Sequence, residues 1–184
     1  MAERPPRPSR ADGAHLILVG LPGAGKSTIG RKVADQLDWP FLDFDEEIER
    51  RAGLPVAEIF ARHGEPHFRG LERGITEELR GRAAAVLAPG GGWMTVPGLA
   101  ALLRPPGRII YLDVSPAAAL ANLGRGVARR PLLRGPEPLK ALERLLAERD
   151  GVYRTADLVL RAEGVDLQDV VTAIARLASP SGAA

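Results

Sequence analysis

The sequence of 184 residues contains no cysteine. This absence excludes disulfide bonds, thiolate catalysis and zinc sites with cysteine ligands. Aromatic residues make up only 4% of the chain, so alanine, leucine and valine have to build the core. No apolar run approaches the roughly 20 residues that a membrane-spanning helix requires, and no signal-peptide pattern is present. We therefore expect a cytoplasmic protein with no membrane partner.

Neither sign of charge dominates, because 25 Lys and Arg face 23 Asp and Glu and leave a net charge of +2. Nucleic-acid binders usually carry a larger basic excess along one stripe, so no nucleic-acid partner is expected. The length favours one domain, which we place at residues 14–178. Residues 1–13 and 179–184 are expected to be disordered tails, and the protein is expected to be a monomer.

Residues 20–27 fit the phosphate-binding motif G-x-x-x-x-G-K-[ST] at every fixed position. The motif follows an apolar run and precedes a helical pattern, which is the context that a P-loop requires. Lys26 would reach the β- and γ-phosphates, and the Ser27 hydroxyl would bind Mg²⁺. An ordinary glycine-rich turn is the alternative, but it does not account for all these matches, so we expect binding of a nucleoside triphosphate. The residues expected to surround the phosphates are Gly23, Ala24, Gly25, Lys26, Ser27 and Thr28.

Strand-like apolar runs alternate with helical patterns along the chain, which predicts an α/β fold with a parallel sheet covered on both faces. Five strands are expected, at His15–Gly20, Phe41–Phe44, Ala85–Ala88, Arg108–Leu112 and Asp157–Leu160. Helices are expected at 28–37, 45–52, 56–62, 65–82, 96–103, 116–123, 139–149 and 167–177. Residues 124–138 should form an irregular loop that acts as a mobile lid. This layout predicts a three-layer P-loop kinase fold, with ligands at the carboxyl ends of the strands.

Two aspartates, Asp43 and Asp45, follow the second expected strand, where alternation would place both on one side. One carboxylate beside a P-loop can order the water shell of a metal ion. The other can accept hydrogen bonds from an acceptor hydroxyl or take its proton. The alternative is that Asp43 is solvated and Asp45 only caps the following helix.

Arg69 and Glu72 are three apart in a helical pattern, so the glutamate can orient the arginine towards a substrate carboxylate. The alternative is an exposed ion pair of little energetic value. Gly90, Gly91 and Gly92 end the third expected strand and permit a close backbone approach. A tight turn between a strand and a helix is the alternative there.

The predicted lid at 124–138 contains four arginines: Arg125, Arg129, Arg130 and Arg134. A mobile basic segment can close over ATP, exclude water and neutralise charge on the transferred phosphoryl group. A solvated basic loop is the alternative. The three histidines, His15, His63 and His67, have no ligand-like spacing and are interpreted as non-catalytic.

Together these motifs resemble the shikimate kinase family over about residues 16–177. The matching stretches, in the family's order, are Gly20–Ser27, Phe41–Asp45, Glu58–Phe60, Gly64–Glu72, Gly90–Gly92, Arg130–Leu133 and Arg149–Tyr153. The resemblance implies transfer of the ATP γ-phosphoryl group to the 3-hydroxyl of shikimate with Mg²⁺, a step of chorismate and aromatic amino acid biosynthesis.

The resemblance also implies a role for each matching residue. Arg69 and Arg149 would hold the carboxylate of shikimate, while Asp45 and the backbone of residues 90–92 would hold its hydroxyls. Glu72 would orient Arg69. Asp43 would lie near Mg²⁺ through water, and Lys26 and Arg130 would stabilise the transferring phosphoryl group. Asp45 is the expected base if one is needed, and Arg125 would contact adenine.

Some positions depart from the family's pattern. The stretch 124–130 is shorter than usual, and residues 161–165 show no match to an adenine-contacting loop. Trp93, directly after the triple glycine, is unusual and would narrow or reshape the acceptor site. Two other functions remain open: a kinase of another small hydroxy acid such as gluconate, or a non-catalytic nucleotide-binding regulatory module. The second explains less, because nucleotide binding alone requires none of Asp43, Asp45, Arg69 and Arg130.

Overall fold

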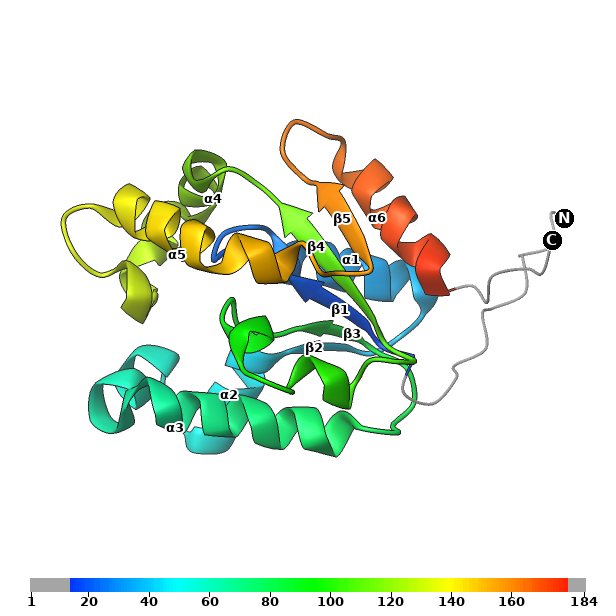
Figure 1. Ribbon diagram of the computed structural model, residues 1–184, viewed down its shortest axis with the longest axis horizontal. Helices are drawn as coiled ribbons and strands as arrows, with labels where there is room; N and C mark the ends of the chain where they lie inside the picture. Colours follow the sequence, from blue (N-terminus) through cyan, green and yellow to red (C-terminus); the bar gives the residue numbers. More distant parts are fainter. Residues whose placement is uncertain (1–13, 179–184) are drawn as a thin grey trace, which may run out of the picture.

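The computed structural model describes residues 14–178, in which five parallel strands form one sheet (Figure 1). The strand order is β2-β3-β1-β4-β5. The strands are β1 (Leu16–Val19), β2 (Phe41–Asp43), β3 (Val86–Ala88), β4 (Arg108–Asp113) and β5 (Leu158–Arg161). The five expected strands are therefore confirmed, with small shifts at their ends. Both expected tails, residues 1–13 and 179–184, lie outside the described residues.

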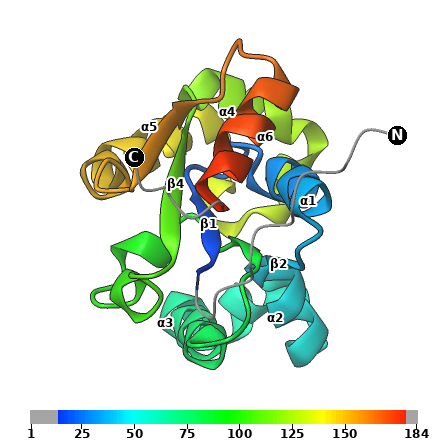
Figure 2. The same cartoon turned by 90° about the vertical axis from the view of Figure 1, so that its right-hand side faces the viewer.

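Helices cover both faces of the sheet (Figures 1 and 2). On one face lie α1, α4 and α6, and on the other lie α2 and α3, as expected for three layers. The α-helices are α1 (Lys26–Leu37), α2 (Phe44–Ala52), α3 (Val56–Leu79), α4 (Pro116–Leu123), α5 (Pro138–Tyr153) and α6 (Leu167–Ala175).

Strand β1 shows how the sheet divides the core. All four of its residues are buried. Leu16 and Leu18 pack into the cluster formed with α1 and α6, whereas Ile17 and Val19 pack into the cluster formed with α2 and α3. An apolar run that is buried on both faces is typical of a central parallel strand, and it places the following loop at the middle of the sheet's carboxyl edge.

Two segments differ from their expected conformation. Residues 96–103 do not form the expected helix: Pro97 is followed by Gly98 at a φ of 75°, which interrupts helical geometry and leaves only a 3₁₀ turn at Ala100–Leu102. Residues 124–138 are more regular than the expected loop. They contain 3₁₀ helices at Gly124–Arg129 and Pro131–Leu133 before α5 begins.

Helix α3 is bent at Gly64, as the two separate helical patterns predict. The φ of Gly64 is 79° and its ψ is 171°, so the residue is not helical. Pro66 follows within the first turn after the bend, where a missing N–H costs little. The bend allows the second half of α3 to run under the sheet, with Phe68 and Ile75 buried against it.

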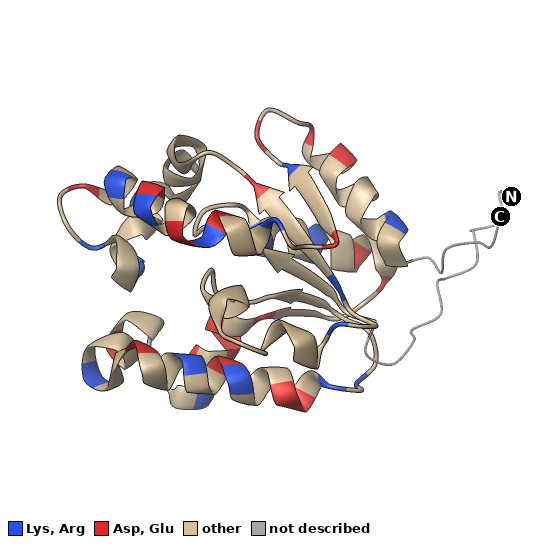
Figure 3. Ribbon diagram, viewed as in Figure 1, with Lys and Arg blue, Asp and Glu red and all other residues tan. Residues whose placement is uncertain are grey.

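Charged residues of both signs are intermingled along α3 and α5 (Figure 3). Several of them form ion pairs three or four residues apart, such as Arg62 with Glu58 and Arg73 with Glu77 on α3. Within residues 14–178, no helix combines the length and the apolar character needed to cross a membrane.

His15 precedes β1 and connects it to the end of α3 and the start of β3. Its burial predicts that the stability of the protein falls in acid. Its side chain is fully buried; the Ala85 N–H donates to Nδ1 at 3.2 Å, and Nε2 lies 3.0 Å from the Leu79 carbonyl oxygen. Burial lowers the pKa of His15. The unfolded chain therefore binds more protons than the folded protein below pH about 6.5, and stability should fall there by at most about 1.4 kcal/mol per pH unit.

This prediction is tested by urea unfolding between pH 7.5 and 5. The His15→Gln variant should lose this part of the pH dependence, although it is less stable at every pH. The matched control is His63→Gln, because His63 is exposed; it should keep the slope of the unaltered protein. An identical slope in the His15→Gln variant would contradict the assignment.

Candidate active site

A cavity of about 440 Å³ lies at the carboxyl edge of the sheet, beside the loop between β1 and α1. Expected residues from four separate stretches, the P-loop, the segment at the end of β2, the triple glycine and the predicted lid, contribute to its walls. The residues that line it are 22–29, Asp43, Asp45, 88–91, Asn122, Leu123, Arg130, Ala162 and Leu167. The cavity therefore has the position expected for a ligand site in a parallel sheet.

The P-loop backbone adopts conformations that favour glycine. Gly23 has a φ of 86°, and a Cβ atom there would lie 2.2 Å from the Ala119 carbonyl oxygen. Gly25, with a φ of 88°, is the N-cap of α1. Because α1 begins at Lys26, its unpaired N–H groups and its positive dipole end lie at the cavity, where they suit an anion.

Lys26 extends back along the P-loop. Its Nζ donates to the carbonyl oxygens of Gly20 and Leu21, both at 3.0 Å. Burial lowers the pKa of Lys26 to about 8, although the nearby Asp45 carboxylate favours the charged form. These carbonyl contacts keep the ammonium group at the cavity, where a phosphate can replace them as its partner.

Asp43 connects β2 to the P-loop. Its Oδ2 accepts a hydrogen bond from the Ser27 hydroxyl at 2.5 Å, and its Oδ1 accepts from the N–H groups of Asp45 and Glu46. The prediction that Asp45 shares a strand face with Asp43 is wrong, because β2 ends at Asp43 and Asp45 lies in the first turn of α2. The cap of this helix is Asp43, but both carboxylates still line the cavity.

Asp45 pairs with the arginine of the predicted lid. Arg130 Nη1 lies 2.5 Å from Asp45 Oδ2, and the two side chains are 41% and 24% exposed. Burial raises the pKa of Asp45 more than the attraction of Arg130 lowers it. This contact joins the 124–138 segment to the start of α2 across the cavity.

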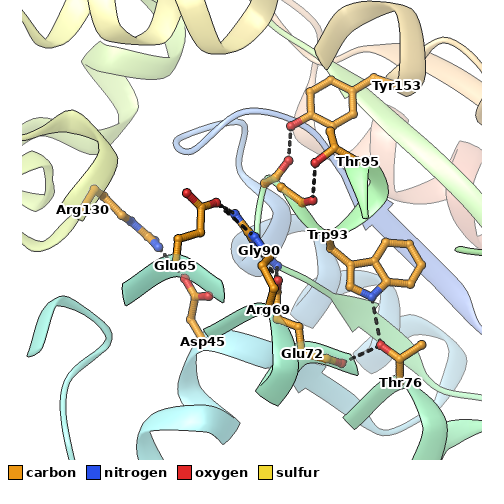
Figure 4. A network of polar contacts seen from close by, with 12 residues as sticks. Asp45, Glu65, Arg69, Glu72, Thr76, Gly90, Trp93, Thr95, Arg130 and Tyr153 are labelled. Atoms are coloured by element: carbon orange, nitrogen blue, oxygen red, sulfur yellow. Dashed lines mark hydrogen bonds and ion pairs between the residues drawn. The ribbon is translucent and has the colours of Figure 1, made fainter. Parts of the chain in front are cut away.

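Arg69 is held from two sides by carboxylates (Figure 4). Its Nη1 donates to Glu72 Oε2 at 2.5 Å, while its Nε and Nη2 donate to Glu65 Oε1 at 3.1 and 2.6 Å. Glu72 is fully buried, and its other oxygen accepts the Gly90 N–H at 3.1 Å. The expected pair of Arg69 and Glu72 is thus present, and the alternative of an exposed ion pair is wrong.

The pKa shifts of Glu72 and Arg69 reflect the burial of this ion pair. Burial raises the pKa of Glu72 in spite of the opposing attraction of Arg69. Burial also disfavours the charge of Arg69, but Glu72 and Glu65 outweigh it, so the pKa of Arg69 is raised. The guanidinium is therefore a permanent, oriented cation.

The triple glycine is required by the side chains that pack on it. A Cβ at Gly90 would lie 2.5 Å from Glu72 Oε1, and one at Gly92 would lie 2.2 Å from Arg69 Nη2. Any larger residue would displace the pair of Arg69 and Glu72. A tight turn alone does not explain these glycines, because the close approach is made by charged side chains.

Arg149 approaches the same loop from α5. It is buried, and its Nη1 would lie 3.2 Å from a Cβ at Gly91, which itself would lie 3.3 Å from the Gly20 carbonyl oxygen of the P-loop. The Tyr153 hydroxyl donates to the Gly91 carbonyl oxygen and also contacts the Arg149 side chain. The loop at 90–92 thus joins Arg69, Arg149 and the P-loop.

Trp93 does not narrow the cavity, so that expectation is wrong. Its side chain is fully buried in the core between the sheet and α3. Its indole N–H donates to Thr76 Oγ1 at 2.9 Å, and the Thr76 hydroxyl donates to the Glu72 carbonyl oxygen at 2.7 Å. Trp93 therefore fixes the 90–92 loop to α3 from below.

Some residues that line the cavity were not predicted from the sequence, and the predicted residue Arg125 lies outside the lining. Asn122 donates to the Gly23 carbonyl oxygen at 3.0 Å and lines the cavity; its amide in a helix of alanine and leucine was an available signal. Ala162 and Leu167 line the cavity without any signal in the sequence. Arg125 is exposed and is not among the lining residues, so its contact with adenine stays a prediction.

Known proteins match nearly the whole chain. The family model described as "Shikimate kinase" matches residues 22–178. A shikimate kinase of Nitrobacter winogradskyi is 42% identical over 86% of this chain and 74% of the relative. A shikimate kinase of Geobacter sulfurreducens is 39% identical over 90% of this chain and 91% of the relative.

Solved structures agree with the sequence comparison. The shikimate kinase of Acinetobacter baumannii in complex with shikimate superposes with a TM-score of 0.84 at 37% identity, covering 89% of this chain and 92% of that one. A gluconokinase of Sinorhizobium meliloti, at a TM-score of 0.58 and 18% identity, shares the fold alone. Because the family model and these relatives match most of the described fold, the chain belongs to the shikimate kinase family.

Proposed function

We propose that the protein transfers the γ-phosphoryl group of ATP to the 3-hydroxyl of shikimate, giving shikimate 3-phosphate for chorismate biosynthesis. The observation that carries this proposal is the 90–92 loop. It adjoins the P-loop at Gly20 and packs against two arginines, so a cyclic hydroxy acid held there lies next to the phosphate site.

The acceptor side of the site suits shikimate. Arg69 and Arg149 are the cations for its carboxylate, since both lie against the 90–92 loop. Asp45 and the Gly91 backbone are the partners for its hydroxyls. Burial raises the pKa of Asp45, which makes this carboxylate a candidate for accepting a proton from the acceptor hydroxyl.

The phosphoryl side relies on positive charge. Lys26 and Arg130 stabilise the charge on the transferring group, while the N-terminus of α1 binds the phosphates. Ser27 and Asp43 supply a hydroxyl and a carboxylate that are in direct contact, an oxygen donor set that fits Mg²⁺. When bound, Mg²⁺ would neutralise phosphate charge. Among residues 14–178 no group of three His, Cys, Asp or Glu side chains that could hold a metal ion is found.

The 124–138 segment is the proposed lid. Its Arg130 pairs with Asp45, so closing over a nucleotide requires Arg130 to exchange this carboxylate for a phosphate. The exchange would place one cation on the phosphoryl group and free Asp45 for the acceptor at the same time. The monomeric state, the cytoplasmic location and the lack of a nucleic-acid partner stay predictions.

The deciding measurement is ADP release from MgATP with shikimate, compared with gluconate, quinate and no acceptor. Saturable dependence on shikimate alone is the expected result. Strong turnover of gluconate instead would favour the other kinase activity. ATP binding without stimulation by any acceptor would favour the regulatory module and reject the proposal.

A further inference from the structure

Arg69 has two carboxylate partners that hold different edges of its guanidinium. Glu72 takes Nη1, whereas a single oxygen of Glu65 takes both Nε and Nη2. A guanidinium has two edges that each present a pair of parallel donors. The edge formed by Nε and Nη2 is the one that does not involve Nη1, which donates to Glu72. A ligand carboxylate needs two such donors for a bidentate contact, so Glu65 holds the edge that the acceptor requires.

The two glutamates differ in their freedom to move. Glu72 is fully buried and is bound to the Gly90 backbone through its second oxygen, so it cannot leave without disrupting the loop. Glu65 is 45% exposed and lies directly after the bend at Gly64. Water can solvate its carboxylate as soon as it leaves Arg69.

We propose that Glu65 takes the place of the acceptor's carboxylate in the unliganded protein and must be displaced when the acceptor binds. The two anions cannot share this edge, because like charges repel at such distances. Glu65 thereby weakens the binding of any ligand whose only contact is a carboxylate on Arg69. It favours the binding of acceptors that make further contacts in the site. This inference rests on the proposed function of the same site.

A second contact in the same site has the same character. Arg130 forms an ion pair with Asp45, which is the proposed partner of an acceptor hydroxyl. Figure 4 draws both contacts, that of Glu65 with Arg69 and that of Arg130 with Asp45. Binding of the acceptor therefore replaces ion pairs that are already present in the site. Of the four residues in these two pairs, Glu65 is the one to which the proposed reaction gives no other role.

The test compares shikimate with its neutral methyl ester in the intact protein and in Glu65→Gln, by calorimetric binding and by ADP release. Glu65→Gln keeps the shape and removes the charge. It should strengthen the binding of shikimate and lower its KM about two- to fivefold, the range for a partly exposed ion pair. Binding of the ester, which has no carboxylate to place on Arg69, should not change.

The matched control is Glu58→Gln, which removes the same kind of carboxylate from an i,i+4 pair with Arg62 on α3; its shikimate KM should equal that of the unaltered protein. Weaker or unchanged shikimate binding in Glu65→Gln would overturn the inference, since Glu65 would then support Arg69 or be neutral. The two proposals fail separately: lack of turnover with intact shikimate binding rejects the function only, whereas lack of shikimate binding rejects both.

Discussion

Replacing Lys26 with methionine is expected to lower kcat about a hundred- to a thousandfold. Methionine keeps the length of the side chain but removes the only positive charge that the P-loop residues 20–27 supply. Charge placed on a transferring phosphoryl group by a fixed donor is worth about this factor when it is lost. Single-turnover kinetics with saturating MgATP and shikimate would measure the loss in the transfer step.

Lys32 offers the matched control for this experiment. It lies on the same helix, α1, but its side chain is exposed and away from the cavity. Lys32→Met should leave kcat unchanged. Near-normal turnover in the Lys26→Met variant, with the fold confirmed by its unfolding midpoint, would contradict the assignment of the phosphate site.

The lowered pKa of Lys26 adds a pH dependence to this prediction. Its charged form binds phosphate, and in the free protein half of that form is lost at a pH of about 8. The kcat/KM for ATP should therefore be constant below pH 7 and fall as pH rises through 8, because this parameter reports groups of the free enzyme. The Lys32→Met variant should show the same profile.

The sequence predicts the local parts of this site well. The P-loop and its flanking strand and helix are encoded within 22 consecutive residues, Leu16–Leu37, and the spacing of Arg69 and Glu72 on one helix predicts their pair. In each case the chemistry depends on neighbours in the chain. The order of the motifs then suffices to place them, because parallel strands bring their carboxyl ends to one edge.

The sequence predicts long-range contacts poorly. The side chain of Trp93 turns into the core because Thr76, 17 residues away, accepts its N–H. Asp45 does not share a strand face with Asp43 because the Asp43 side chain caps α2, which begins at Phe44, one residue before the expected start. The contact of Arg130 with Asp45, 85 residues apart, has no signal in the sequence. The contact of Glu65 with Arg69 is local, but its i,i+4 spacing does not distinguish it from an ordinary surface pair.

The Arg69→Ala variant should raise the KM for shikimate about ten- to a hundredfold, while the KM for ATP changes little. It removes a charge-assisted hydrogen bond to the acceptor's carboxylate, which is worth about 1.5–3 kcal/mol. The contacts proposed for the nucleotide come from the P-loop and the N-terminus of α1, which this substitution does not alter. Steady-state kinetics with each substrate varied in turn would separate the two effects.

Loss of Arg69 also leaves the buried Glu72 without its cation, which costs about 3–5 kcal/mol of stability when a buried pair is broken. The raised pKa of Glu72 provides a partial escape, because the carboxyl can take up a proton. Arg69→Lys therefore complements the alanine variant: it keeps a positive charge for Glu72 but lacks the planar fork. If orientation of the fork is what binds the acceptor, Arg69→Lys should be as stable as the unaltered protein and still bind shikimate weakly.

The exposed Arg62 on the same helix is the control for general effects of removing an arginine from α3. Arg62→Ala should leave both KM values unchanged. An unchanged shikimate KM in both Arg69 variants would move the carboxylate site away from the 90–92 loop. It would also leave the close packing of Gly90 and Gly92 against Glu72 and Arg69 as a purely structural feature, because the same contacts would then stabilise the loop without serving the acceptor.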